Sequence, residues 1–206
     1  MPGHGSRAPR GFQAPGGGVI DDRTQWNERY RSRPHPQEAA AIVREYAGIA
    51  PGRRALDVAA GNGRNALFLA AAGFTVDALD ISDEGLSRFA GLSPRVRPAC
   101  VDLDRFDIPR GRYDLIVNIL YVNRRLFPAL REGLRPGGVL IFESLLMPAD
   151  PAEAAGRRLD YYLRENELLH SFLSLHLLFY REAESKGEEE PPRRLASLVG
   201  RRRPGD

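Results

Sequence analysis

Cysteine is almost absent from this sequence, since Cys100 is the only one among 206 residues. A single thiol excludes an internal disulfide and any metal site built from several thiolates. Cys100 lies in an apolar segment, so we expect a small core residue rather than a nucleophile. Histidine is scarce as well, and the four histidines lack the spacing to acidic or thiol partners that marks a metal site. We therefore expect no bound metal.

Long apolar runs are also missing. None approaches the roughly 20 residues that a membrane-spanning helix needs, and Met1–Ser6 lacks the apolar core of a signal peptide. We expect a soluble, cytoplasmic protein without a membrane partner. The net charge is only +3, and much of it is arginine near the two ends. This distribution favours solvated tails over a nucleic-acid partner.

The composition that remains is globular, with 42% hydrophobic and 28% charged residues, enough for one substantial core. Residues 1–18 are rich in glycine, proline and arginine, which predicts a disordered tail. Residues 19–50 are expected to form a helical lid segment, with Trp26 and Tyr30 on one helix face. Residues 51–199 hold the main domain, and residues 200–206 form a basic C-terminal tail.

Within the main domain, strand and helix patterns alternate, which predicts a parallel sheet with helical crossovers. We expect a helix from Ser82 to about Leu92, another from Arg124 to Leu134, and a turn at 135–138. A long loop at 182–194 would separate the last two strands, and 148–156 would be another loop. The predicted strands cover residues 54–59, 74–80, 96–101, 113–119, 139–143, 175–181 and 195–199.

A glycine turn joins the first strand to the first helix of this pattern. Gly61-Asn62-Gly63-Arg64-Asn65-Ala66 matches the G-x-G-x-x-A dinucleotide fingerprint, and Asp80 follows Gly61 by 19 residues. Such a turn brings backbone N–H groups and a helix N-terminus to a nucleotide. Taken alone, the motif favours NAD as the ligand, but a single glycine motif is weak evidence for any particular nucleotide.

Three acidic residues change this interpretation. Asp57 lies four residues before Gly61, where it would repel a pyrophosphate and suits a cationic ligand. The alternative is that Asp57 only ties down neighbouring backbone amides. Asp80 and Asp102 end the next two strands, so three carboxylates should share the edge where open α/β sheets bind ligands.

These residues carry a resemblance to a known family. Leu56–Gly63 resembles motif I of the class I S-adenosylmethionine-dependent methyltransferases, and Leu134–Gly138 resembles the turn before their fifth strand. Trp26–Tyr30 and Gly63-Arg64-Asn65 look most like the small bacterial tellurite-resistance-type members. One departure is Ala59, where the family usually has glycine. Alanine lacks easy access to positive φ.

The resemblance implies an α/β, Rossmann-like, doubly wound sheet of seven strands, mostly parallel, with a C-terminal antiparallel hairpin. Residues 51–199 would then be a methyltransferase domain, and its cofactor would be S-adenosylmethionine. The implied cofactor-binding residues are Tyr30, Asp57, Ala59, Gly61, Gly63, Asp80, Ile81, Asp102, Leu103 and Asn118.

The resemblance also assigns roles. The turn from Ala59 to Gly63 would lie along the methionine part of the cofactor, with Asn118 near the methyl group. Asp80 would accept hydrogen bonds from both ribose hydroxyls. Asp102 would sit by the adenine amine, and the ring would lie between Ile81 and Leu103. Arg29 or Tyr30 would close over the cofactor carboxylate.

No catalytic residue is evident. An in-line displacement from a sulfonium draws much of its acceleration from positioning, and Tyr121 is the nearest candidate for a general base. We predict methyl transfer to an unidentified acceptor, a small molecule being favoured. Two alternatives stay open: a non-catalytic protein that binds the cofactor, and an NAD-dependent oxidoreductase. The sequence gives no indication of oligomeric state.

Overall fold

A computed structural model describes residues 19–148, 158–184 and 193–205. Seven strands form one sheet in the order β3-β2-β1-β4-β5-β7-β6, in which β7 runs antiparallel to both β5 and β6 and the other pairs are parallel. The predicted fold class is therefore confirmed. The strands are β1 (Arg54–Val58), β2 (Thr75–Asp80), β3 (Val96–Cys100), β4 (Tyr113–Ile119), β5 (Leu134–Leu145), β6 (His176–Glu184) and β7 (Arg194–Arg201).

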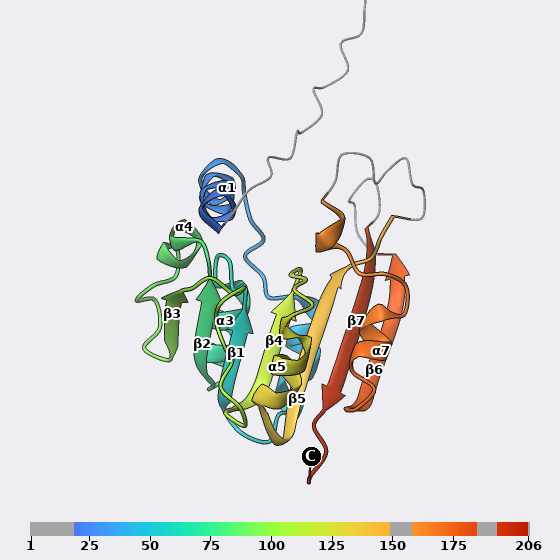
Figure 1. Ribbon diagram of the computed structural model, residues 1–206. Coiled ribbons are helices and arrows are strands. Elements are labelled where there is room, and N and C mark those ends of the chain that lie inside the picture. The colour runs from blue at the N-terminus through green and yellow to red at the C-terminus, as the bar shows by residue number, and fades with distance from the viewer. Residues whose placement is uncertain (1–18, 149–157, 185–192, 206) are drawn as a thin grey trace, which may run out of the picture.

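Helices cover both faces of the sheet, and α1 lies beyond the carboxyl ends of β1 to β3, next to α4 (Figure 1). One face carries α2 (Ala41–Tyr46), the short η1 (Ala47–Ile49), α3 (Arg64–Ala71) and α4 (Asp83–Ser87). The other carries α5 (Leu126–Gly133) and α7 (Glu167–Ser171). The remaining elements are α1 (Val19–Ser32) and η2 (Leu159–Tyr161).

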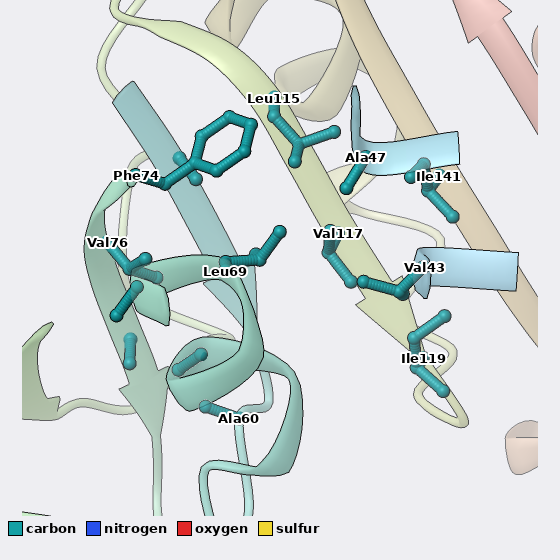
Figure 2. Packing of buried hydrophobic residues seen from close by; sticks show 14 of the residues in the cluster. Val43, Ala47, Ala60, Leu69, Phe74, Val76, Leu115, Val117, Ile119 and Ile141 are labelled. Carbon is teal, nitrogen blue, oxygen red and sulfur yellow. The ribbon is translucent and has the colours of Figure 1, made fainter. Parts of the chain in front are cut away.

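The core has two halves because side chains of a strand alternate between faces. In β4, Leu115, Val117 and Ile119 point to the face of α2 and α3, as Figure 2 shows. Tyr113 and Ile116 pack on the face of α5. All seven residues of β4 are buried, as expected of a central strand with both faces covered.

Some boundaries differ from the prediction. The expected turn at 135–138 lies inside β5, whose pairing with β4 shifts register between Tyr113 and Leu115. Helix α4 ends at Ser87, well before Leu92. Cys100 is exposed, so the expected core position is wrong. It ends β3, an edge strand covered less completely than the central strands, and its thiol donates to the Ile81 carbonyl at 3.3 Å.

Several predictions fall on residues outside the described ranges: the tail at 1–18, nearly all of the loop at 148–156, and 185–192 of the long loop. Within the described ranges, no helix is long and apolar enough to cross a membrane. The same residues contain no group of three or more His, Cys, Asp or Glu side chains placed to hold a metal ion.

Candidate active site

The three predicted carboxylates stand at the carboxyl ends of neighbouring strands. Asp57 is the penultimate residue of β1, Asp80 ends β2, and Asp102 follows β3 by two residues. Parallel pairing of β1 with β2 and of β2 with β3 brings these ends together at one edge of the sheet. This is the edge where open α/β sheets bind ligands.

Asp57 is the most deeply buried of the three, with 1% of its surface exposed. Burial and the charge of Asp80 raise the pKa of Asp57 to about 7. A backbone hydrogen bond from Ala66 and the charge of Arg64 act in the opposite direction and lower it. Its Oδ2 is buried with no hydrogen-bond partner among the described residues. A buried acceptor without a donor is costly unless a ligand supplies one.

Asp80 organises the turn after β1. Its Oδ2 accepts a 2.8 Å hydrogen bond from the Gly61 N–H, and its Oδ1 accepts one of the same length from the Ser82 N–H. Burial raises the pKa of Asp80, although these backbone bonds oppose the shift. A carboxylate offers about four acceptor positions. Backbone bonds from Gly61, Ser82 and Ile81 leave part of this capacity for a ligand. The structural role of Asp80 in the turn was not indicated by the sequence pattern.

The backbone of the turn is left-handed at three positions: Ala59 (φ 53°), Gly61 (φ 58°) and Gly63 (φ 77°). Glycine adopts this conformation without steric penalty. Ala59 adopts it too, although alanine was expected to hinder it. Its neighbour Ala60 is held by a 2.9 Å hydrogen bond from its N–H to the Leu79 carbonyl, which fixes the path of the turn.

The strain at Ala59 is testable. We expect Ala59→Gly to stabilise the protein by up to about 1 kcal/mol, because relief of about 1–2 kcal/mol of left-handed strain exceeds the cost of a more flexible unfolded chain. Ala59→Val should destabilise it, since a β-branched residue fits this region worst. Urea unfolding measures both changes. A lower midpoint for the glycine variant would contradict the assignment of strain.

Tyr30 covers the glycine turn. A Cβ built on Gly61 would lie 2.3 Å from the Tyr30 hydroxyl, and one on Gly85 would lie 3.0 Å from its ring. The His35 ring lies against the Tyr30 ring, with centroids 4.4 Å apart and the planes tilted by 38°. Burial raises the pKa of the Tyr30 phenol. The structure thus places Tyr30 against the glycine turn.

Helix α1 is attached to α4 mainly by polar contacts, which sequence reasoning missed. Asn27 donates to Asp83 at 2.8 Å and accepts from the Ser82 hydroxyl at 2.6 Å. Arg23 pairs with Asp83 at 3.0 Å, and Arg31 pairs with Glu84 at 2.5 Å. On the far side, Arg158 pairs with Asp22 at 2.8 Å. Helix α1 is thereby tied to the loops on both sides of the edge.

Polar residues around the glycine turn hold the segment that leads into α2. Asn62 donates to the Pro36 carbonyl at 2.9 Å, and Arg64 donates to the Glu38 carbonyl at 3.1 Å. Asn65 accepts from the Ala40 N–H at 3.0 Å. These polar residues entered the sequence analysis only as part of the glycine motif and the family resemblance, neither of which indicated this structural role.

The predicted adenine side lies farther along the edge. Asp102 accepts from the Asp104 N–H, while its Oδ2 is buried without a hydrogen bond among the described residues, 3.5 Å from Arg105 Nε. Ile81 is half-buried, and Leu103 is buried in the core half beside α5. Asn123 donates to Asp104 at 2.7 Å and so ties this loop to the one after β4.

Asn118 and Tyr121 hold the loop after β4. Asn118 is buried and donates from Nδ2 to the Tyr121 carbonyl at 2.7 Å. Burial raises the pKa of the Tyr121 phenol to about 12. A phenol with this pKa stays protonated at neutral pH, so the raised pKa gives little support to Tyr121 as a general base.

Residues 55–138 match the family model described as "Methyltransferase domain". Residues 55–138 of the chain thus carry the signature of a methyltransferase domain. Together with the fold, this match confirms the prediction of a class I S-adenosylmethionine-dependent methyltransferase. The match begins inside β1 and ends in the first part of β5, so the methyltransferase domain includes the glycine turn and all three carboxylates. No curated protein matches this chain by sequence.

Solved structures similar to the methyltransferase domain support the fold. TehB from Haemophilus influenzae superposes with a TM-score of 0.69 at 19% identity, over 88% of this chain and 67% of that one. A Burkholderia thailandensis 1,6-didemethyltoxoflavin-N1-methyltransferase, solved with that substrate and S-adenosylhomocysteine, gives 0.65 at 16% identity, over 94% of each chain. The [4+2]-cyclase SpnF gives 0.68 at 18% identity, over 91% and 94%. At these identities the similarity concerns the fold alone.

Proposed function

We propose that this protein transfers a methyl group from S-adenosylmethionine to a small-molecule acceptor by in-line displacement. The observation that carries the proposal is the pair of orphaned carboxylate oxygens, on Asp57 and Asp102, at the carboxyl edge of the sheet. Each would gain a donor from a ligand with amine groups at both ends. S-adenosylmethionine has that form and supplies a methyl group already activated on a sulfonium.

The chain's own residues would bind and orient this cofactor. Asp57 would face the cationic amino acid end, and Asp80 would accept hydrogen bonds from the ribose hydroxyls. Asp102 would accept from the adenine amine, with Ile81 and Leu103 beside the ring. Catalysis would then come from positioning, which converts an encounter into an aligned reaction.

The remaining assignments concern the turn, the lid and the loop after β4. Backbone groups from Ala59 to Gly63 would lie along the methionine part, and Tyr30 would cover it. Asn118, bonded to the Tyr121 carbonyl, would set the loop near the methyl group. A cytoplasmic location also remains our proposal.

Thermal unfolding with S-adenosylhomocysteine tests the proposal. A ligand at 100 times its Kd stabilises the folded state by about 2.7 kcal/mol, so the melting temperature should rise by several degrees. NAD should give no such shift. The absence of a shift at millimolar S-adenosylhomocysteine would refute cofactor binding.

One alternative function, cofactor binding without methyl transfer, is worth testing because a [4+2]-cyclase has the same fold. A protein that binds the cofactor without transferring its methyl group would show the thermal shift but release no S-adenosylhomocysteine. Product release across a panel of small-molecule acceptors therefore separates the two functions.

The polar attachment of α1 predicts easy opening of the lid. We expect Asn27→Ala to remove three hydrogen bonds, worth about 0.5–1.5 kcal/mol each, between α1 and the start of α4. Amide hydrogen exchange in residues 19–32 should then rise about tenfold, while exchange in the sheet stays unchanged. Glu28→Ala, an exposed change on the same helix, serves as the control. Equal exchange in both variants would contradict this account of docking.

A further inference from the structure

A small cavity lies on the α2 face of the sheet, beyond the glycine turn. Its volume is about 220 Å³, and it is bounded by α2, β5, β6 and β7. Tyr46 from α2 and Phe179 from β6 form an aromatic wall, with ring centroids 5.5 Å apart. The size is below that of pockets for drug-sized ligands, which suits a small molecule or one part of a larger one.

The floor of the cavity is a carboxylate. Glu143 of β5 lies opposite Ser197 of β7 in the antiparallel register, and the buried Ser197 hydroxyl donates to Glu143 Oε2 at 2.7 Å. Within the described ranges Glu143 forms no ion pair. Carboxylates in partly enclosed sites are normally paired, so Glu143 has the capacity to bind a cationic group.

Nearby charges leave Glu143 available. Arg181 of β6 also lines the cavity, but its guanidinium lies over the Phe179 ring, with Cζ 5.8 Å from the centroid. Arg64 interacts electrostatically with Glu143 but more strongly with Asp57. A second carboxylate, Glu45, lines the rim and hydrogen-bonds the Tyr46 hydroxyl. An acidic floor beside aromatic rings favours an amine-bearing ring over an anion.

The cavity adjoins the proposed cofactor site. Glu143 pairs with Ile119 at the carboxyl end of β4, and β4 pairs with β1, which carries Asp57. Two strand spacings separate Glu143 from β1, or about 10 Å. Ile119 and Ile141 lie on the face of α2 (Figure 2), and Glu143, two residues after Ile141, points to the same face.

The arginines on the other side of the edge are already paired. Arg124 binds Glu167 and the Tyr162 carbonyl, and Arg125 binds the carbonyls of Leu103 and Phe106. Neither is therefore available to receive an anionic acceptor without breaking these bonds. We propose that the cavity floored by Glu143 holds the protonated amine of a small aromatic acceptor. This inference rests on the proposed methyl transfer.

Three probes of one shape and different charge test the proposal: benzylamine, benzyl alcohol and benzoate, each titrated into the full chain saturated with S-adenosylhomocysteine. Amide chemical shifts near Glu143 and Ser197 should move with benzylamine and little with the other two. Glu143→Gln keeps an acceptor for the Ser197 hydroxyl but loses the charge, so benzylamine should bind about tenfold more weakly. Ala41→Trp, which fills the cavity from α2, should block binding.

The control is Glu184→Gln, an exposed change on β6 outside the cavity, which should leave benzylamine binding unchanged. Equal binding of benzoate, or no effect of Glu143→Gln, would overturn the proposal. If S-adenosylhomocysteine binds to the original protein and to every variant equally, but benzylamine binds to none of them, the acceptor assignment fails and the proposed function stands. If S-adenosylhomocysteine itself does not bind, the methyl-transfer role of the cavity falls with it.

Discussion

Asp80→Ala will abolish stabilisation by S-adenosylhomocysteine and weaken its binding by about 100-fold or more. Two charge-assisted hydrogen bonds to ribose hydroxyls would be lost, each worth about 1.5–3 kcal/mol. The turn would also loosen, because the Gly61 and Ser82 N–H groups lose their common acceptor. Isothermal titration calorimetry measures the affinity, and urea unfolding of the ligand-free protein measures the structural part.

Asp77→Ala is the matched control. Asp77 lies on the same strand, where it pairs with Arg54 at 2.7 Å and accepts from the Tyr113 hydroxyl, away from the carboxyl edge. Its loss should destabilise the fold but leave the affinity unchanged. Asp80→Asn, which keeps one acceptor oxygen, should bind with an intermediate loss and covers the case in which the alanine variant does not fold. If Asp80→Asn and Asp80→Ala both bind S-adenosylhomocysteine with undiminished affinity, Asp80 does not bind the ribose.

The sheet and the position of the three carboxylates at its carboxyl edge could be predicted from the sequence because they depend on local patterns. The apolar run 113–119 coincides with β4, since a strand buried on both faces must be apolar throughout. The acids Asp57, Asp80 and Asp102 were found because each stands near the carboxyl end of a strand. Their convergence follows from parallel pairing alone.

Other features depend on contacts between distant residues and leave no periodic signal. Asn27 meets Ser82 across 55 positions, and Glu143 meets Ser197 across 54. Neither pair could be found without the antiparallel register or the docking of α1. The exposure of Cys100 had a similar origin, because only the strand order shows that β3 is an edge strand.

Asp57 gives the ligand-free protein a pH-dependent stability. The pKa of this carboxyl rises from 3.8 in the reference state to about 7 in the fold, so the folded state binds more protons between these values. The contribution of Asp57 to stability is therefore greatest below about pH 4 and falls by about 4 kcal/mol as pH rises through about 7. Asp57→Asn should remove that component from a series of urea unfolding curves.

The same ionisation should control cofactor affinity. A cationic amino group binds the ionised carboxylate, so binding releases a proton, and the affinity for S-adenosylhomocysteine should rise about tenfold from about pH 6 to about pH 8. Calorimetry in two buffers of different ionisation enthalpy would detect the proton. Asp57→Asn should bind more weakly and without this slope, whereas Asp114→Asn, at a buried acid near the start of β4, should keep it. A slope that survives in Asp57→Asn would show that another group binds the cation.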